Sequence, residues 1–288
     1  MKKNKIYKGI YILPAFLIFF TLYLLPSLLG LFLSMTNWNS MSDTIKFIGL
    51  ENYRKIFSDK GIWNVWSNTI LYAVMTSIFK AVFGMLLALA LNREIRSRNA
   101  LRTIFFLPMV ISNLIVGMAF QQILHPEHGI LNVGLRAIGL GSLAQSWLID
   151  PKVAIWSCIG LEIWKASGFN MVIFLAGLQG VPQELCEACV IDGANSWNEF
   201  WYVTFPMIMP SVVINMMLNV ISGLKVFDVI FTLTNGGPGR VTEVINITIF
   251  KQFSMGDYGY STALNTILFV VLSIISIAVI RVYTKEDE

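Results

Sequence analysis

Charged side chains are scarce in this sequence of 288 residues. Asp, Glu, Lys and Arg make up 13% of the chain, whereas hydrophobic residues make up 56%. A soluble domain carries about 25% charged residues, so this chain has too few to cover a surface that faces water. The same figures exclude an intrinsically disordered chain. A mean hydropathy of +0.67 therefore indicates an all-α integral membrane protein.

Residues and motifs that carry chemistry are also few. The chain has three cysteines and two histidines, and an odd number of cysteines argues against a disulfide framework. The sequence contains no G-x-x-x-x-G-K-[ST] phosphate loop, no H-E-x-x-H motif and no G-x-S-x-G motif. We therefore expect no enzyme activity and no cofactor in this chain, and any ATP-driven step would need a separate ATPase subunit.

Long apolar runs with few charges occur six times, and each is long enough for a helix that crosses a bilayer. They lie at 10–35, 67–91, 103–124, 153–178, 206–227 and 263–283. The third and fifth runs are interrupted by proline or asparagine, so a count of five or seven spans stays open. The interrupting residues are Pro108, Asn113, Asn215 and Asn219. The sequence thus predicts a polytopic protein with about six transmembrane helices and no internal repeat.

The positions of Lys and Arg predict which side each loop faces, because cytoplasmic loops carry an excess of both. Four lysines precede the first run (Lys2, Lys3, Lys5 and Lys8), and the short loop 92–102 holds Arg93, Arg96, Arg98 and Arg102. We expect both segments in the cytoplasm, and six spans then place both termini there. The first run is too long for a signal-peptide core, so we expect an uncleaved span.

The loop 179–205 should also be cytoplasmic, yet it has no Lys or Arg. Pro182 suits the start of a short helix, and Gly193 is placed to end that helix in a left-handed conformation. Ser196-x-x-Glu199 reads as a capping box that starts a second helix. The loop is therefore predicted to be a short helix, a glycine turn and a second helix. It is either an amphipathic connector at the headgroup level or a docking site for a cytosolic partner.

This loop also resembles a family signature. It reads Glu-Ala-Cys at 187–189, glycine at 193 and Val-x-Phe-Pro at 203–206, which resembles the E-A-A…G…I-x-L-P signature of permease subunits in binding-protein-dependent ABC importers. Cysteine, valine and phenylalanine replace the usual alanine, isoleucine and leucine. The flanking residues 183–185 and 191–194 resemble the carbohydrate branch, which includes maltose and multiple-sugar permeases. Further resemblances to that branch lie at 47–53, 175–179 and 234–239.

The resemblance implies a type I ABC importer permease fold, with residues 1–288 as a single transmembrane permease domain. Loop 179–205 would dock on the ATPase, and the residues implied to carry this coupling are Glu187, Ala188, Asp192 and Gly193. The expected partners are a sister permease in a heterodimer, two ATP-binding cassette subunits that bind the ATP, and an extracytoplasmic solute-binding protein. The location would be a bacterial or archaeal plasma membrane, and the cargo a sugar or oligosaccharide.

Polar and aromatic residues in the fourth and fifth runs form a candidate carbohydrate path, because amides match sugar hydroxyls and aromatic faces stack on sugar rings. These residues are Trp164, Lys165, Phe169, Asn215, Asn219 and Ser222. Asparagines in spans also hydrogen-bond between helices, and that alternative stays open. Glu162 and Lys165 are spaced to pair locally, while Lys80 has no assigned role. Loops 37–66 and 233–262 are expected to contact the binding protein.

Other readings of the sequence remain possible. The same importer family could carry a different cargo such as glycerol 3-phosphate, or the chain could be a self-sufficient secondary transporter. Cys186 and Cys189 form a C-x-x-C pattern, and His125 and His128 are spaced as two metal ligands, but neither set has the further ligands that a metal site needs. The sequence does not name the sugar.

Overall fold

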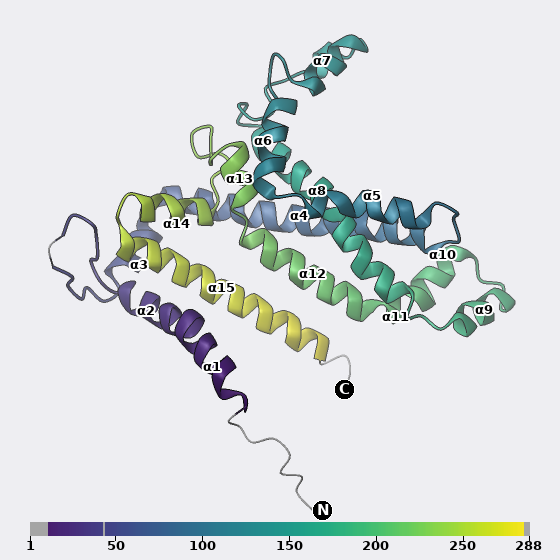
Figure 1. Ribbon diagram of the computed structural model, residues 1–288, viewed down its shortest axis with the longest axis horizontal. Coiled ribbons are helices and arrows are strands. Elements are labelled where there is room, and N and C mark those ends of the chain that lie inside the picture. Colours follow the sequence, from purple (N-terminus) through teal and green to yellow (C-terminus); the bar gives the residue numbers. More distant parts are fainter. Residues whose placement is uncertain (1–10, 43, 285–288) are drawn as a thin grey trace, which may run out of the picture. The chain divides into compact units, whose positions relative to one another are not determined.

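The structure is a computed structural model that describes residues 11–42 and 44–284 (Figure 1). Lys2, Lys3, Lys5 and Lys8, on which the expected orientation of the N-terminus depends, lie outside the described residues. Within the described ranges the chain is helical, apart from one isolated antiparallel bridge between Thr36 and Phe47. The prediction of an all-α polytopic membrane protein is confirmed.

The helices follow one another with short connections. In chain order they are α1 (Leu13–Phe19), the π-helical turn η2 (Phe20–Leu24), α2 (Leu25–Leu33), α3 (Glu51–Ser58), α4 (Lys60–Asn92), α5 (Arg98–Val110), α6 (Asn113–Ile123), α7 (Ile130–Ala137), the 3-10 turn η3 (Gly141–Leu143), α8 (Ala154–Leu178), α9 (Gln183–Ile191), α10 (Ser196–Glu199), the π-helical turn η4 (Phe200–Thr204), α11 (Phe205–Met207), α12 (Met209–Leu224), α13 (Asp228–Leu233), α14 (Ile245–Ser254) and α15 (Tyr258–Thr284).

Four continuous helices in the described part are long and apolar enough to cross a membrane: Leu13–Leu33, Lys60–Asn92, Ala154–Leu178 and Tyr258–Val279. Two further spans are bent. The pair α5 and α6 turns through 95° at its break, and the segment Ser196–Met207 turns through 71° against α12. The count is six when each bent pair is taken as one span. The break between α5 and α6 lies in the third apolar run, beside Asn113. The second bend lies at Ile208, near the start of the fifth run, and its first half, Ser196–Met207, belongs mostly to the predicted loop 179–205.

Contacts divide the chain into two compact units, one of residues 1–62 and 248–271, the other of residues 63–247 and 272–288. In the first unit, Asn52 holds the connection that follows α2. Its side-chain amide donates to the carbonyl oxygens of Ser34 at 2.8 Å and Thr36 at 2.9 Å. The hydroxyls of Ser34 and Tyr53 lie 2.7 Å apart. The motif at 47–53 therefore closes the end of the first span.

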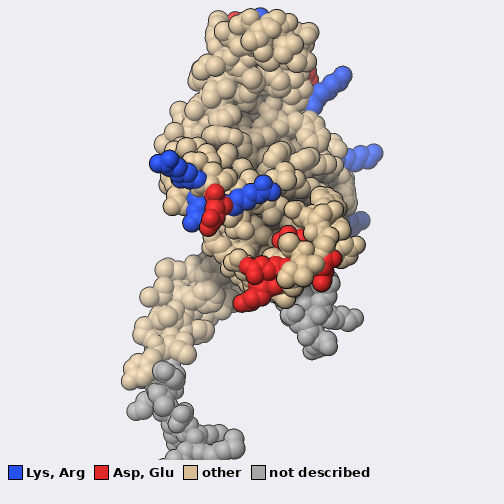
Figure 2. All heavy atoms as spheres, turned by 90° about the vertical axis from the view of Figure 1, so that its right-hand side faces the viewer, with Lys and Arg blue, Asp and Glu red and all other residues tan. Residues whose placement is uncertain are grey.

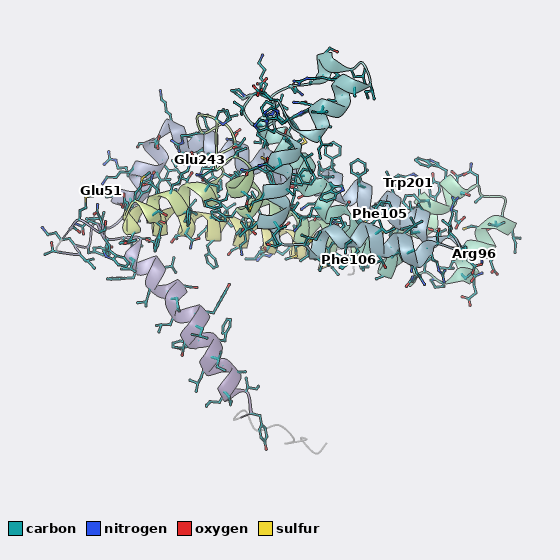
Figure 3. All side chains as sticks on the ribbon, turned by 45° about the horizontal axis from the view of Figure 1, so that its top comes forward. Glu51, Arg96, Phe105, Phe106, Trp201 and Glu243 are labelled. Carbon is teal, nitrogen blue, oxygen red and sulfur yellow. The ribbon has the colours of Figure 1, made fainter. Side chains whose placement is uncertain are left out.

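The second unit is built around α8. One apolar cluster joins this helix to residues of α4 and α13, and includes Tyr72, Cys158 and Ile230. A second cluster lies toward the other end of α8 and includes Leu91 and Phe174. Helix α5 packs closely along α8, and Figure 3 labels its side chains Phe105 and Phe106. A Cβ added at Gly168 would overlap the backbone of Phe105, so glycine is needed for this contact.

Candidate functional site

The loop between α8 and α12 folds as the sequence predicts. Helix α9 begins after Pro182 and ends before Gly193, which adopts a left-handed φ of +81°. A glycine tolerates this conformation at no steric cost. The predicted capping box is wrong by one residue, because Asn195 caps α10 and its side chain accepts from the backbone N–H of Asn198 at 2.9 Å. Asparagine is at least as good a cap as serine, which explains the shift.

The four predicted coupling residues, Glu187, Ala188, Asp192 and Gly193, are all exposed on this loop. Glu187 accepts a hydrogen bond from the side-chain amide of Gln183 at 2.9 Å, which orients its carboxylate. Apolar side chains of the same helix are also exposed, and Ile191 is 85% exposed. In Figure 2 acidic side chains gather at the end of the molecule that carries α9 and α10. An exposed surface that is both acidic and apolar is suited to bind another protein.

A groove of about 1000 Å³ lies beside the loop in the second unit. Its walls include Arg93 at the end of α4, Phe174 of α8, Cys186 of α9 and Trp201. Figure 3 shows Arg96 and Trp201 near this same end. The loops 92–102 and 179–205 therefore lie at one end of the unit. Residues 125–126 and 237–238 line a different cavity of about 450 Å³.

The C-x-x-C pattern at this groove consists of free thiols. Partial burial raises the pKa of Cys186 above its ordinary value, and a hydrogen bond to the Glu199 carboxylate raises this pKa further. A raised pKa keeps the thiol protonated at neutral pH, and a protonated thiol is a poor nucleophile and a poor metal ligand. No group of three or more His, Cys, Asp or Glu in the described part of the chain could hold a metal ion.

His125 acts within its own turn. Its Nδ1 atom accepts from the backbone N–H groups of Glu127 at 3.2 Å and His128 at 3.3 Å. The two histidine rings stack with centroids 5.2 Å apart. These contacts account for both histidines as parts of the loop that leads into α7.

Lys80, which had no assigned role, forms an ion pair inside the second unit. Its ammonium lies 3.3 Å from the Glu162 carboxylate and 3.4 Å from the Ser222 hydroxyl, and the residue is 1% exposed. The expected local pairing of Glu162 with Lys165 is wrong, because Glu162 pairs with Lys80 across two helices. Side-chain spacing on one helix gives no information about a cation that a neighbouring helix supplies.

Lys165 is 5% exposed and donates to the side-chain oxygen of Asn113 at the start of α6. The amide nitrogen of Asn113 donates in turn to the Asp228 carboxylate at 2.8 Å. One asparagine therefore links a buried cation to an exposed anion. Our reading of the sequence missed Asn113 and Asp228 as partners. The interruption of the third run at Asn113 was the only signal.

The asparagines of α12 hydrogen-bond to each other and to α8. The amide of Asn219 donates to the side-chain oxygens of Asn170 at 2.5 Å and Asn215 at 2.7 Å. Asn215 is 1% exposed and Asn219 is 5% exposed. These two residues take part in the interhelical contact that the sequence left open as an alternative. Ser222, one turn further along, is exposed.

The aromatic members of the predicted path lie on α8. Trp164 is 47% exposed and packs against Phe120 of α6, with ring centroids 5.2 Å apart. Phe169 is half-buried. The structure thus places Trp164 and Lys165 beside α6, whereas Asn215 and Asn219 are enclosed between α8 and α12.

Up to six apolar spans in the described residues, two of them bent, define a polytopic membrane protein. Residues 80–285 match the family described as binding-protein-dependent transport system inner membrane component, and the chain belongs to this family. Its expected place is a cell membrane that it crosses several times.

Two relatives match nearly the whole chain. The probable starch degradation products transport system permease protein AmyD of Thermoanaerobacterium thermosulfurigenes is 33% identical over 99% of this chain and 95% of its own length. The multiple sugar-binding transport system permease protein MsmF of Streptococcus mutans is 31% identical over 98% of this chain and 97% of its own length.

One solved structure is that of a bacterial alginate ABC transporter in complex with its periplasmic protein, which is bound to an alginate pentasaccharide. A chain of that complex superimposes on this one with a TM-score of 0.82 and 25% identity, covering 93% of this chain and 91% of that chain. The fold described above is therefore that of an ABC importer permease.

Proposed function

We propose that this chain is one of two permease subunits in an ATP-driven importer and forms half of the transmembrane path for a carbohydrate. The observation that carries the proposal is the loop 179–205. It combines the family signature with four exposed coupling residues in a loop whose sequence has no Lys or Arg. The chain itself would carry out no hydrolysis, since ATP would bind to the separate ATPase subunits.

The coupling residues Glu187, Ala188, Asp192 and Gly193 would contact one of two ATP-binding cassette subunits. The acidic side chains suit a basic groove, and the exposed apolar side chains suit a desolvated contact. The loops 92–102 and 179–205 line one groove, which supports their placement on the same side of the membrane. With six spans, both termini would then face the cytoplasm. Residues 1–288 would form one permease domain, because the family match covers parts of both compact units.

The carbohydrate cargo is supported by the names of the relatives AmyD and MsmF, which refer to starch products and multiple sugars. An extracytoplasmic binding protein would deliver the cargo, as the complex of the alginate transporter suggests. Trp164 presents an exposed aromatic face of the kind that stacks on sugar rings. The Ser222 hydroxyl donates to the Asn219 carbonyl at 2.9 Å and lies 3.4 Å from the Lys80 ammonium. A sister permease would supply the other half of the path.

Copurification through a tag on this chain, from its native membrane in mild detergent, tests the proposal. We expect a second permease and two ATPase subunits to accompany each copy of the chain. Recovery of the ATPase should fall in Gly193→Asp. Gly139 provides a matched control, because its φ is +80° and a Cβ there meets nothing within 4 Å, as at Gly193. Gly139→Asp carries the same backbone strain and should retain the ATPase. Equal loss in both variants, or a wild-type chain that purifies alone, contradicts the proposal.

A further inference from the structure

The third span is divided between two packing partners. Its first half, α5, lies along α8 with the backbone of Phe105 against Gly168. Its second half, α6, packs mainly on α13 and touches α8 through Asn113 and Phe120. A Cβ at Gly117 would lie 2.6 Å from the side chain of Thr232, and the Gln121 amide donates to the Thr232 carbonyl at 2.5 Å. Helices α6 and α13 therefore form one packed pair, which we call the α6–α13 pair.

Each member of this pair is joined to the preceding helix by a few non-helical residues. Ile111 and Ser112, between α5 and α6, have ψ values of 139° and 135°. Phe227, between α12 and α13, has φ −141° and ψ −61°. The first link interrupts the third span, and the second follows the end of the fifth span at Leu224. Both are places where the chain can turn without unwinding a helix.

The first residues of the two helices meet at these links. Asn113 begins α6, Asp228 begins α13, and the amide nitrogen of Asn113 donates to the Asp228 carboxylate at 2.8 Å. The amide oxygen of Asn113 accepts from Lys165, a buried residue of α8. An asparagine can accept from a cation and donate to a carboxylate at the same time, which Asp and Leu cannot do.

We propose that Asn113 is a positioning residue for transport that holds the α6–α13 pair against α8, and that the passage of cargo requires its hydrogen bond with Lys165 to break while its bond with Asp228 stays within the pair. The inference rests on the proposed importer function. Because Lys165 is buried, its cation strongly favours the closed arrangement in which Asn113 accepts from it. Movement of the pair about the two links separates Asn113 from Lys165 while Gly117 and Thr232 stay packed.

The barrier to this movement makes ATP hydrolysis depend on cargo. In the intact transporter, the loaded binding protein would supply the free energy that opens the contact. Without the contact, apolar contacts such as Phe120 against Trp164 still hold the pair on α8. The pair then leaves α8 more readily, and the ATPase turns over without cargo. A residue with a merely structural role would lower activity together with assembly and would leave the amount of cargo moved per ATP unchanged.

The test measures ATP hydrolysis and sugar uptake by the assembled transporter in liposomes, with and without loaded binding protein. We expect Asn113→Leu to raise hydrolysis in the absence of binding protein about fivefold and to lower the cargo moved per ATP to a similar extent. Asp228→Asn is the matched control, since its side-chain oxygen still accepts from Asn113. It should keep both values within about twofold of the wild type.

Asn113→Leu leaves Lys165 buried without a partner, and the transporter could fail to assemble for that reason alone. A second variant avoids this problem. The triple replacement Lys165→Met, Asn113→Leu and Asp228→Leu removes every polar group of the contact and should also hydrolyse ATP without cargo. Wild-type cargo per ATP in either variant overturns the inference and leaves the importer function standing. A wild-type chain without any ATPase subunit overturns the importer function, and the inference with it.

Discussion

Polar residues are exposed in loop 179–205 but buried and paired in the interior of the spans. In the loop, Glu187 and Asp192 are exposed and no basic residue of the loop neutralises them. Within the spans, Lys80 and Lys165 are buried and bonded to groups of the same chain. The loop leaves its acidic groups exposed, whereas the polar groups inside the spans hold helices together. Changes in the loop should therefore affect activity, and changes in the spans should affect stability first.

The largest effect that this comparison predicts is on transport, from a charge reversal in the loop. Glu187→Lys should lower sugar uptake about 100-fold, since charge reversal at an interface costs about 2–5 kcal/mol, while the chain stays in the membrane. Uptake of labelled sugar in cells and the amount of chain in membrane fractions measure the two quantities. Glu127→Lys changes another exposed acid in a different loop and should transport normally. Loss of transport in both variants would show that the effect is not specific to loop 179–205.

The next effect is on stability, from the ion pair inside the spans. Glu162→Leu leaves the Lys80 cation buried without its carboxylate, which should cost about 3–5 kcal/mol of stability. The melting temperature of the purified chain in detergent reports this change. The double variant Lys80→Met and Glu162→Leu should recover most of the loss, because no charge is then left unpaired. A double variant as unstable as the single one would show that the pair does not act as a unit.

A smaller effect is expected where α5 meets α8. Gly168→Ala forces a methyl group into the backbone of Phe105, and such overpacking costs about 1–3 kcal/mol. Gly160→Ala on the same helix is the control, since a Cβ there meets nothing within 4 Å. It should be neutral or slightly stabilising, by up to about 1 kcal/mol, because alanine favours helix more than glycine does. Thermal unfolding of the two variants, measured side by side, compares their stabilities.

The smallest effect concerns the reactivity of Cys186 in the loop. Burial and Glu199 raise the pKa of this thiol, so its thiolate fraction at pH 8 is below that of an ordinary cysteine. Glu199→Gln removes the negative charge and lowers the pKa, and the thiolate fraction rises. Alkylation at pH 8, in a background of Cys158→Ala and Cys189→Ser, should become about two- to fivefold faster, since the thiolate is the reactive form. An unchanged rate would mean that Glu199 does not act on the thiol.

The sequence predicted the helical spans because their signal is local. Apolar runs of sufficient length must form helices in a bilayer, where each backbone polar group needs a partner within its own segment. The break in the third span lies next to Asn113, one of the residues that interrupt that run. The bend of the fifth span lies at Ile208 instead of at Asn215 or Asn219. The helix–turn–helix form of the loop could also be predicted, since Pro182 and Gly193 act on the backbone within a few residues. Its cap at Asn195 was missed because serine and asparagine compete closely for that position.

The hydrogen-bond and ion-pair partners of residues inside the spans could not be predicted in this way. Spacing on α8 favoured a pair between Glu162 and Lys165, but each of these residues bonds instead to a different helix. The asparagines of α12 fit two roles equally well by spacing, and their burial against Asn170 became visible only in the structure. Hydrogen bonds between residues 49 to 82 positions apart leave no periodic trace in the sequence.

Hydropathy and turn chemistry act over short stretches of chain, so the membrane class, the positions of the spans and the loop with its signature could be predicted from the sequence. The packing of the helices was needed to show which charges pair, that α5 lies along α8 while α6 packs mainly on α13, and that Asn113 joins Lys165 to Asp228. The physical reason is that a buried polar group in a membrane protein must find a partner in space, and the packing of helices decides which one lies within reach.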